Sequence, residues 1–189
     1  MLLANRLIPQ GRGLAPALVK RAATIELDWD VRQKSRFDTT DSQGRTLGVI
    51  LPRGNVARGG DVLVAQDGSL IRVVAAPQQV LVVRHCTEHG APFDLLRAAY
   101  HLGNRHVQLE LTADHLKLEP DHVLADMLRQ MHLIVTQQTE PFEPEAGAYA
   151  AQPGHGHENG HEQAHEQAHE HGHEHGHEHG HGHDHSKHS

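Results

Sequence analysis

The last part of the chain, residues 151–189, limits most strongly what this sequence can fold into. It ends in "HEHGHEHGHEHGHGHDHSKHS" and consists mainly of His, Glu, Gly, Gln and Ala. Such a segment has almost no apolar surface to bury, so it cannot offset the entropy lost on ordering. We therefore expect residues 151–189 to form a disordered tail without metal, and the folded core to lie within residues 1–150.

Histidine is concentrated in this tail, which holds fourteen of the 21 histidines. Neutral imidazole is the commonest protein ligand for zinc, copper and nickel ions. A cloning tag fits less well, because the histidines are interleaved with Glu, Gln and Ala, and fourteen are too many to be incidental to an acidic tail. Those of "HEQAHEQAHE" lie four residues apart, so we expect this piece to gain helix when metal binds. The predicted tail ligands are His155, His157, His161, His165, His169, His171, His173, His175, His177, His179, His181, His183, His185 and His188.

Charge and composition exclude several classes of protein. Seven acidic side chains and one lysine give the tail −6 of the chain's formal −7, so residues 1–150 are nearly neutral. A neutral body argues against a broad nucleic-acid-binding surface. The single cysteine, Cys86, excludes an intrachain disulfide and favours a reducing compartment. No signal peptide or membrane-length apolar run is evident, so we expect a cytoplasmic protein without membrane or nucleic-acid partners.

Short strands are predicted for the first part of the chain. Residues 23–74 show alternating or short apolar runs that stop at turn residues, whereas the first 20 residues are ambiguous. Asp67 and Gly68 separate two apolar runs and are typical of a tight hairpin, whose backbone needs positive φ. We therefore expect a small all-β domain, residues 1–76, that is closed by hairpins.

A different pattern follows from residue 77 to residue 150. Two segments with helical spacing, "PFDLLRAAYHLG" and "DHVLADMLRQMH", alternate with four strand-like runs. Asp121 is the expected N-cap of the second helix, and the first should end at Gly103 and Asn104 with positive φ. The resulting β-α-β-β-α-β order is that of ferredoxin-like domains. The whole chain is thus predicted to be an α+β protein with an N-terminal β domain, a ferredoxin-like domain at 77–150 and a His-rich tail.

Three histidines of the second domain are candidate ligands. His101 falls in the last turn of the first helix, where favourable interaction with the helix dipole explains it adequately. His106 follows the turn and stands at the end of an element rather than in a core. One ring cannot hold a transition metal alone, so His106 would need His122, or its own copy across a symmetric dimer.

Catalytic motifs are lacking, and a second metal site stays open. We find no nucleophile–base pair and no phosphate-binding loop, since the glycines after Arg58 mark a turn. We therefore expect a protein that is not an enzyme. His85, Cys86 and His89 could form a mixed nitrogen and sulfur site, but a loop that follows a strand explains them equally well.

Several stretches together resemble the urease accessory protein UreE family. They are "LPRG…ARGGDVLVAQDGSLIRVVAAPQQVLVV", "AYHLGNRHVQLEL" and "LEPDHVLADMLRQMHLIV", followed by the His-rich end. The resemblance covers residues 24–145 and the character of the tail. It implies an N-terminal domain similar to a peptide-binding domain of co-chaperones, and a ferredoxin-like domain that dimerises. It also implies that His106 from two subunits shares one ion and that His122 binds metal, with Pro120 replacing a histidine found in some members.

The resemblance further implies a role in urease maturation. The expected function is a nickel metallochaperone, a homodimer that delivers Ni(II) to the urease apoprotein together with other urease accessory proteins. Ni(II) would be cargo, with Zn(II) or Cu(II) as competitors. Two alternatives stay open: a His-rich protein that stores or detoxifies nickel or zinc, and a peptide-binding chaperone module.

Overall fold

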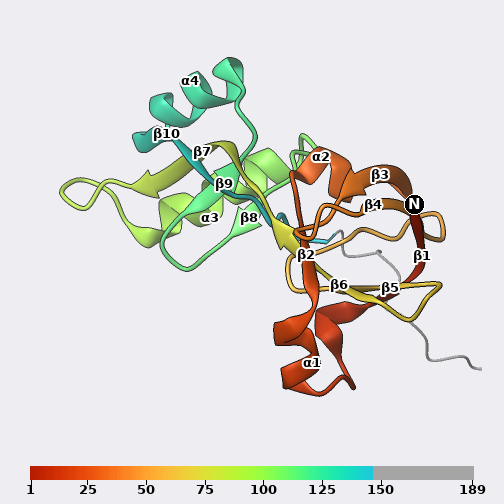
Figure 1. Cartoon of the computed structure of the whole chain (residues 1–189). Coiled ribbons are helices and arrows are strands. Elements are labelled where there is room, and N and C mark those ends of the chain that lie inside the picture. Colours follow the sequence, from red (N-terminus) through yellow and green to blue (C-terminus); the bar gives the residue numbers. More distant parts are fainter. Residues whose placement is uncertain (147–189) are drawn as a thin grey trace, which may run out of the picture. The chain divides into compact units, whose positions relative to one another are not determined.

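The computed structural model describes residues 1–146, which form two sheets (Figure 1). The first is six-stranded, in the order β2-β6-β5-β1-β4-β3. Its strands and the short helices between them are β1 (Leu2–Ile8), η1 (Pro9–Gly11), α1 (Pro16–Arg21), β2 (Ala23–Leu27), α2 (Trp29–Arg32), β3 (Arg36–Thr40), β4 (Thr46–Ile50), β5 (Val62–Ala65) and β6 (Leu70–Ala75).

The expectation of an all-β, hairpin-closed first domain is wrong in two respects. The segment contains the helices α1 and α2, and β1 pairs with β4, and β2 with β6, in parallel. Parallel neighbours need crossover connections rather than hairpins. The strand β2 stops at Leu27, because the carboxylate of Asp28 accepts the N–H of Val31 at 2.9 Å and thereby caps α2.

The predicted hairpin between β5 and β6 is confirmed. Gly68 has φ 84°, which an L side chain rarely adopts. The N–H of Ser69 donates to Asp67 Oδ1 at 2.9 Å, and the N–H of Ala65 donates to the carbonyl of Ser69 at 2.9 Å. The turn chemistry and the register of the two strands therefore support each other.

The second sheet is antiparallel, with the strand order β10-β7-β9-β8 (Figure 1). The order of elements along the chain is β-α-β-β-α-β, as the spacing predicted, and neighbours in the sheet follow the ferredoxin-like pattern. The longest pairing joins β7 and β10 along their full lengths. The elements are β7 (Pro77–His85), α3 (Pro92–Gly103), β8 (Glu110–Leu111), β9 (Leu116–Leu118), α4 (His122–Gln130) and β10 (Leu133–Pro141).

Both faces of the second sheet are covered within the described residues. Alternate residues of β7, Leu81 and Val83, belong to the core that the helices α3 and α4 also supply. Val80 and Val82 point to the opposite face and pack with Trp29 and Phe142 in a separate cluster. Because successive side chains of a strand point to opposite faces, β7 contributes to both cores at once.

Candidate functional site

His106 lies in the turn that ends α3, and its backbone is left-handed with φ 58°. The N–H of His106 donates to the carbonyl of Gly103 at 2.9 Å, and the N–H of Val107 donates to that of Leu102 at 3.1 Å. These two bonds form a Schellman motif in which His106 takes the position usually held by glycine. Val107 packs against the core cluster that contains Leu102, which completes the motif.

The positive φ predicted for Gly103 and Asn104 is therefore wrong. Asn104 has φ −63°, and Gly103 is not among the residues with positive φ. The reversal comes two residues later than expected, because the helical hydrogen bonding continues through Asn104 and Arg105. A left-handed residue with a Cβ costs roughly 1–2 kcal/mol relative to the right-handed region, so the turn holds this exposed imidazole at an energetic cost.

The helix that leads to His106 has a buried and an exposed apolar face. Leu95, Ala98 and Leu102 are buried against the sheet. The large apolar side chains that are exposed on this helix are 61–66% accessible. They are spaced by three and four residues, so they form one stripe. This exposed stripe consists of Phe93, Leu96 and Tyr100.

His122 and His101 occupy the ends of the two helices. His122 is the exposed first residue of α4, directly after Asp121, which accepts the N–H of Leu124 at 2.9 Å as the predicted N-cap. His101 lies in the last turn of α3, with its ring 5.5 Å from that of Tyr100. Within residues 1–146, no three His, Cys, Asp or Glu side chains lie close enough to hold one ion. The described part of one chain thus presents His106 and His122 as separate, exposed candidate ligands.

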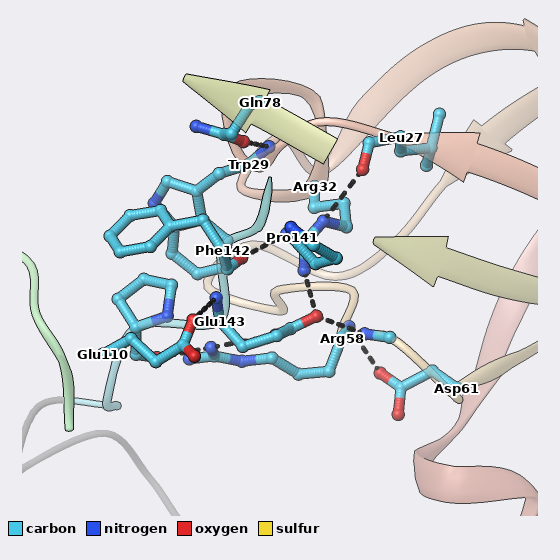
Figure 2. Close-up of polar contacts among 12 residues, drawn as sticks. Leu27, Trp29, Arg32, Arg58, Asp61, Gln78, Glu110, Pro141, Phe142 and Glu143 are labelled. Atoms are coloured by element: carbon cyan, nitrogen blue, oxygen red, sulfur yellow. Dashed lines mark hydrogen bonds and ion pairs between the residues drawn. The ribbon is translucent and has the colours of Figure 1, made fainter. Parts of the chain in front are cut away.

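A buried polar network, which the sequence patterns did not reveal, surrounds Glu143 (Figure 2). The guanidinium of Arg32 donates to the Glu143 carboxylate and to the carbonyl of Phe142. Arg58 lies 3.4 Å from the other Glu143 oxygen, and the N–H of Gly59 donates to this carboxylate at 2.7 Å. The only hint of this network in the sequence was the aromatic residue Phe142, which lies next to the end of a strand.

Trp29, the only tryptophan, lies inside this network. Its ring is 4.8 Å from the guanidinium carbon of Arg58 and 5.1 Å from that of Arg32. The ring of Phe142 meets it edge to face at 6.1 Å. These contacts combine apolar burial with cation–π attraction, so residues far apart in sequence are tied to α2.

The same network fixes the chain close to the His106 turn. The N–H of Glu143 donates to Glu110 Oε2 at 2.7 Å, and the N–H of Glu145 donates to the carbonyl of Leu109 at 2.7 Å. Leu109 is three residues after His106. The backbone that continues into the His-rich segment therefore leaves the described part beside the strand that follows His106. All fourteen predicted tail ligands lie outside the described residues.

The comparisons with known proteins agree on one family. Residues 4–76 match the model of the UreE urease accessory protein N-terminal domain, and residues 78–187 match that of its C-terminal domain. A urease accessory protein UreE of Methylibium petroleiphilum is 76% identical over 156 residues, which cover 82% of this chain and 72% of that protein. That of Paracidovorax citrulli is 77% identical over 151 residues, covering 80% and 72% respectively.

A more distant relative extends the same match. The urease accessory protein UreE of Paraburkholderia xenovorans is 52% identical over 154 residues, which cover 82% of this chain and 67% of that protein. In the part of the chain that the structure describes, no helix is long and apolar enough to cross a membrane. With both family models matched along nearly the whole length, this chain belongs to the UreE urease accessory protein family.

Proposed function

We propose that this chain is a metallochaperone that carries Ni(II) to the urease apoprotein. Membership of a family of urease accessory proteins supports a role in urease maturation. The observation that carries the proposal is the left-handed, exposed His106 at the end of a helix with an exposed apolar stripe. A carrier must bind its ion and also release it, which a site of few exposed imidazoles allows.

The exposed stripe of α3 supports a dimer. Phe93, Leu96 and Tyr100 form a surface that a second copy of the chain can cover in a two-fold interface. A two-fold interface brings the same residues of both subunits together around its axis. Because His106 follows the last turn of this helix, the axis can place two His106 rings around one ion. Each ring needs to be neutral, so nickel affinity should fall as pH drops through roughly 6.5.

His122 is the proposed additional ligand of the body. It is exposed at the start of α4, and Val123 beside it is 62% exposed. The neighbouring hollow of about 260 Å³ is also lined by Pro120, whose side chain brings no donor atom. His122 would therefore hold an ion more weakly than the paired His106 rings.

The His-rich segment is the proposed collector of nickel. His155 is ten residues after Glu145, which is held at Leu109. A chain of ten residues spans at most about 35 Å when fully extended. The first tail imidazoles are therefore tethered within reach of the His106 turn, so that nickel bound by the tail can pass to the body site of the same molecule.

The three parts thus have separate proposed tasks. Residues 151–189 gather metal, residues 77–150 pair two copies and hold the ion, and residues 1–76 bind a partner. The ion then passes to the urease apoprotein, to which other urease accessory proteins are bound. Copper and zinc should compete for the tail, because a set of imidazole ligands follows the general affinity order of divalent ions rather than selecting nickel.

Truncation after Ala150 separates a carrier from a store. We expect the truncated protein to form dimers, to bind about one nickel ion per pair in calorimetry, and to support urease activation when nickel is ample. His106→Ala in the truncated protein should abolish this site, whereas His101→Ala, in the last turn of α3, should leave it intact.

Other results would favour the alternatives. Loss of both nickel binding and activation on truncation would favour a store or detoxification protein, whose function lies in the tail. Full activation by the truncated His106→Ala protein would remove His106 from the mechanism and favour a chaperone module that acts through residues 1–76.

A further inference from the structure

The strand β3 lies at one edge of the first sheet and, within the described residues, pairs only with β4 (Figure 1). The N–H of Leu51 donates to the carbonyl of Ser35 at 2.7 Å, directly before β3 begins. Bonded residues alternate along an antiparallel pair, so Phe37 and Thr39 are the residues of β3 that bond to β4. The backbone N–H and C=O groups that point away from the sheet therefore belong to Arg36, Asp38 and Thr40.

This open edge can accept one further strand. Free backbone groups at the edge of a sheet pair readily with an extended segment of another chain. The side chains of Arg36, Asp38 and Thr40 are exposed as well. Charged side chains on an edge strand keep it from pairing with unsuitable segments. The charges around β3 therefore determine which segment can add to it.

A cationic hollow of about 550 Å³ adjoins the start of β3. Three exposed basic side chains and no carboxylate line this hollow, which is formed by Lys34, Ser35, Arg36, Leu51, Pro52 and Arg53. The ion pairs that involve residues 1–76 use Arg32, Arg45 and Arg58, and no ion pair within residues 1–146 uses the three basic side chains of the hollow. The cationic hollow thus places three positive charges beside the free backbone groups of Arg36.

The charge of the whole first domain favours the same kind of partner. Eleven lysine and arginine side chains and seven aspartate and glutamate side chains give residues 1–76 a formal charge of +4. Residues 77–150 carry five basic and ten acidic side chains, which give a formal −5. The nearly neutral body therefore consists of two domains of opposite charge, and the positive one carries the open edge. Complementary charge steers association and fixes the register of an interface.

We propose that β3 and the cationic hollow bind an extended segment of a partner protein with acidic residues at one end, which adds to the sheet as a further strand. The backbone of this segment bonds to the outward groups of β3, and its acidic end lies against Lys34, Arg36 and Arg53. The residue opposite Asp38 is not acidic, because like charges directly opposite each other destabilise a strand pair. A free phosphate would use the cations alone, so the row of free backbone groups favours a protein segment. This inference rests on the proposed partner-binding task of residues 1–76 and names its surface and the charge of its partner.

Amide hydrogen exchange in the metal-free full chain, measured by NMR, tests the addition of a strand. The probe is a short peptide with a threonine–valine core and glutamates at both ends, so that it can add in either direction. A peptide with lysines in place of the glutamates is the control. We expect the acidic peptide to slow exchange of the outward amides of Arg36, Asp38 and Thr40 at least about tenfold. The amides of Phe37 and Thr39, which already bond to β4, should change little, and the lysine peptide should protect none of them.

Removal of the three charges tests the cationic hollow. The variant combines Lys34→Gln, Arg36→Gln and Arg53→Gln, which are exposed positions outside the cores of the fold. We expect it to bind the fluorescein-labelled acidic peptide at least about tenfold more weakly in fluorescence anisotropy, because the acidic end loses its partners.

A second triple variant is the matched control. Arg12→Gln, Lys20→Gln and Arg21→Gln remove three exposed cations in and directly before α1. This change lowers the net charge of the chain by the same amount but leaves the cationic hollow intact. The control should therefore bind the acidic peptide within about twofold of the wild-type affinity.

Three results would overturn the proposal. An equal loss of affinity in both triple variants would indicate general charge attraction rather than a site. Peptide binding that leaves the outward amides of β3 unprotected would exclude strand addition. Protection of these amides before any peptide is added would show that another part of this protein, or a second copy, covers the edge. Because no nickel is present in these measurements, their failure leaves the proposed nickel site at His106 untouched.

Discussion

The guanidinium of Arg32 and the carboxylate of Glu143 form an ion pair that links α2 to the segment directly after β10 (Figure 2). The Arg32 side chain is fully buried, whereas that of Glu143 is 32% exposed. Burial lowers the pKa of Arg32, and the nearby Glu143 partly offsets this effect. The cost of burying the charge is thus compensated by Glu143 and by the carbonyls of Leu27 and Phe142.

Replacing Arg32 by methionine should destabilise the protein strongly. The variant keeps an aliphatic side chain, but it removes the Arg32 partner of Glu143 and the Arg32 donors to two carbonyl oxygens. We expect a loss of roughly 3 kcal/mol in the free energy of unfolding. Urea unfolding followed by the fluorescence of Trp29, the only tryptophan and a direct neighbour of Arg32, measures this loss.

Arg129→Met is the matched control. Arg129 pairs with Asp126, but both side chains are more than half exposed, at 55% and 66%. An exposed pair of this kind contributes less than about 1 kcal/mol. Equal losses in the two variants would contradict the structural role assigned to Arg32.

The sequence could not predict this ion pair, although it predicted much of the second domain. Arg32 and Glu143 are 111 residues apart, and no local pattern joins them. The β-α-β-β-α-β order was predictable because each element has its own periodicity and because Asp121 marks a helix start. The parallel pairing of β1 with β4 was missed for the same reason as the ion pair, since strand partners are chosen by tertiary packing.

The salt bridges of Lys117 should make stability depend on pH. Lys117 Nζ lies 2.8 Å from Glu140 and 3.1 Å from Glu110, and its side chain is only 10% exposed. Hydrogen bonding from Lys117 lowers the pKa of Glu140. A carboxyl whose pKa is lower in the folded state stabilises the fold above its unfolded pKa, roughly 4.3, and loses this contribution as pH falls through its folded pKa.

Lys117→Met tests this sign. At pH 7 the variant leaves Glu110 and Glu140 unpaired, and we expect a loss of about 2 kcal/mol in the free energy of unfolding. As pH falls below about 4, the carboxyls protonate in both proteins, so the difference between variant and wild type should shrink. Urea unfolding at pH 7 and at about pH 3 measures this change, and a difference that is constant or grows on acidification would contradict it.

Gly103→Ala should stabilise the protein. Gly103 is the last residue of α3, is not left-handed, and has nothing within 4 Å of an added Cβ. Alanine should therefore raise the free energy of unfolding by about 0.5–1 kcal/mol. Gly68→Ala is the control, because it is equally open but has φ 84°, and it should lower stability. If Gly103→Ala lowered the free energy of unfolding instead, this result would support the left-handed conformation that the sequence predicted for Gly103.

The places of the two candidate histidines at element ends were predictable, but the conformation of His106 was not. The order of the two histidine-bearing segments pointed to His106 and His122, and the structure exposes both. The left-handed turn was expected at a glycine and an asparagine, the usual residues for it, and instead fell on the histidine. Val123 shares the apolar helical spacing of α4 but is 62% exposed, because such spacing cannot say which apolar residues face the core.

Because the backbone of His106 is left-handed, replacing His106 by glycine should relieve strain in the turn while it removes the proposed metal ligand. Glycine adopts φ near 58° without steric cost, whereas alanine keeps the strain and lacks the ring. We expect His106→Gly to be more stable than His106→Ala by about 1 kcal/mol in urea unfolding without metal. Both variants, truncated after Ala150, should lack the tight nickel site in calorimetry. Equal stability of the two variants would show that this backbone is not strained, and retained nickel binding would show that the turn does not exist to present a ligand.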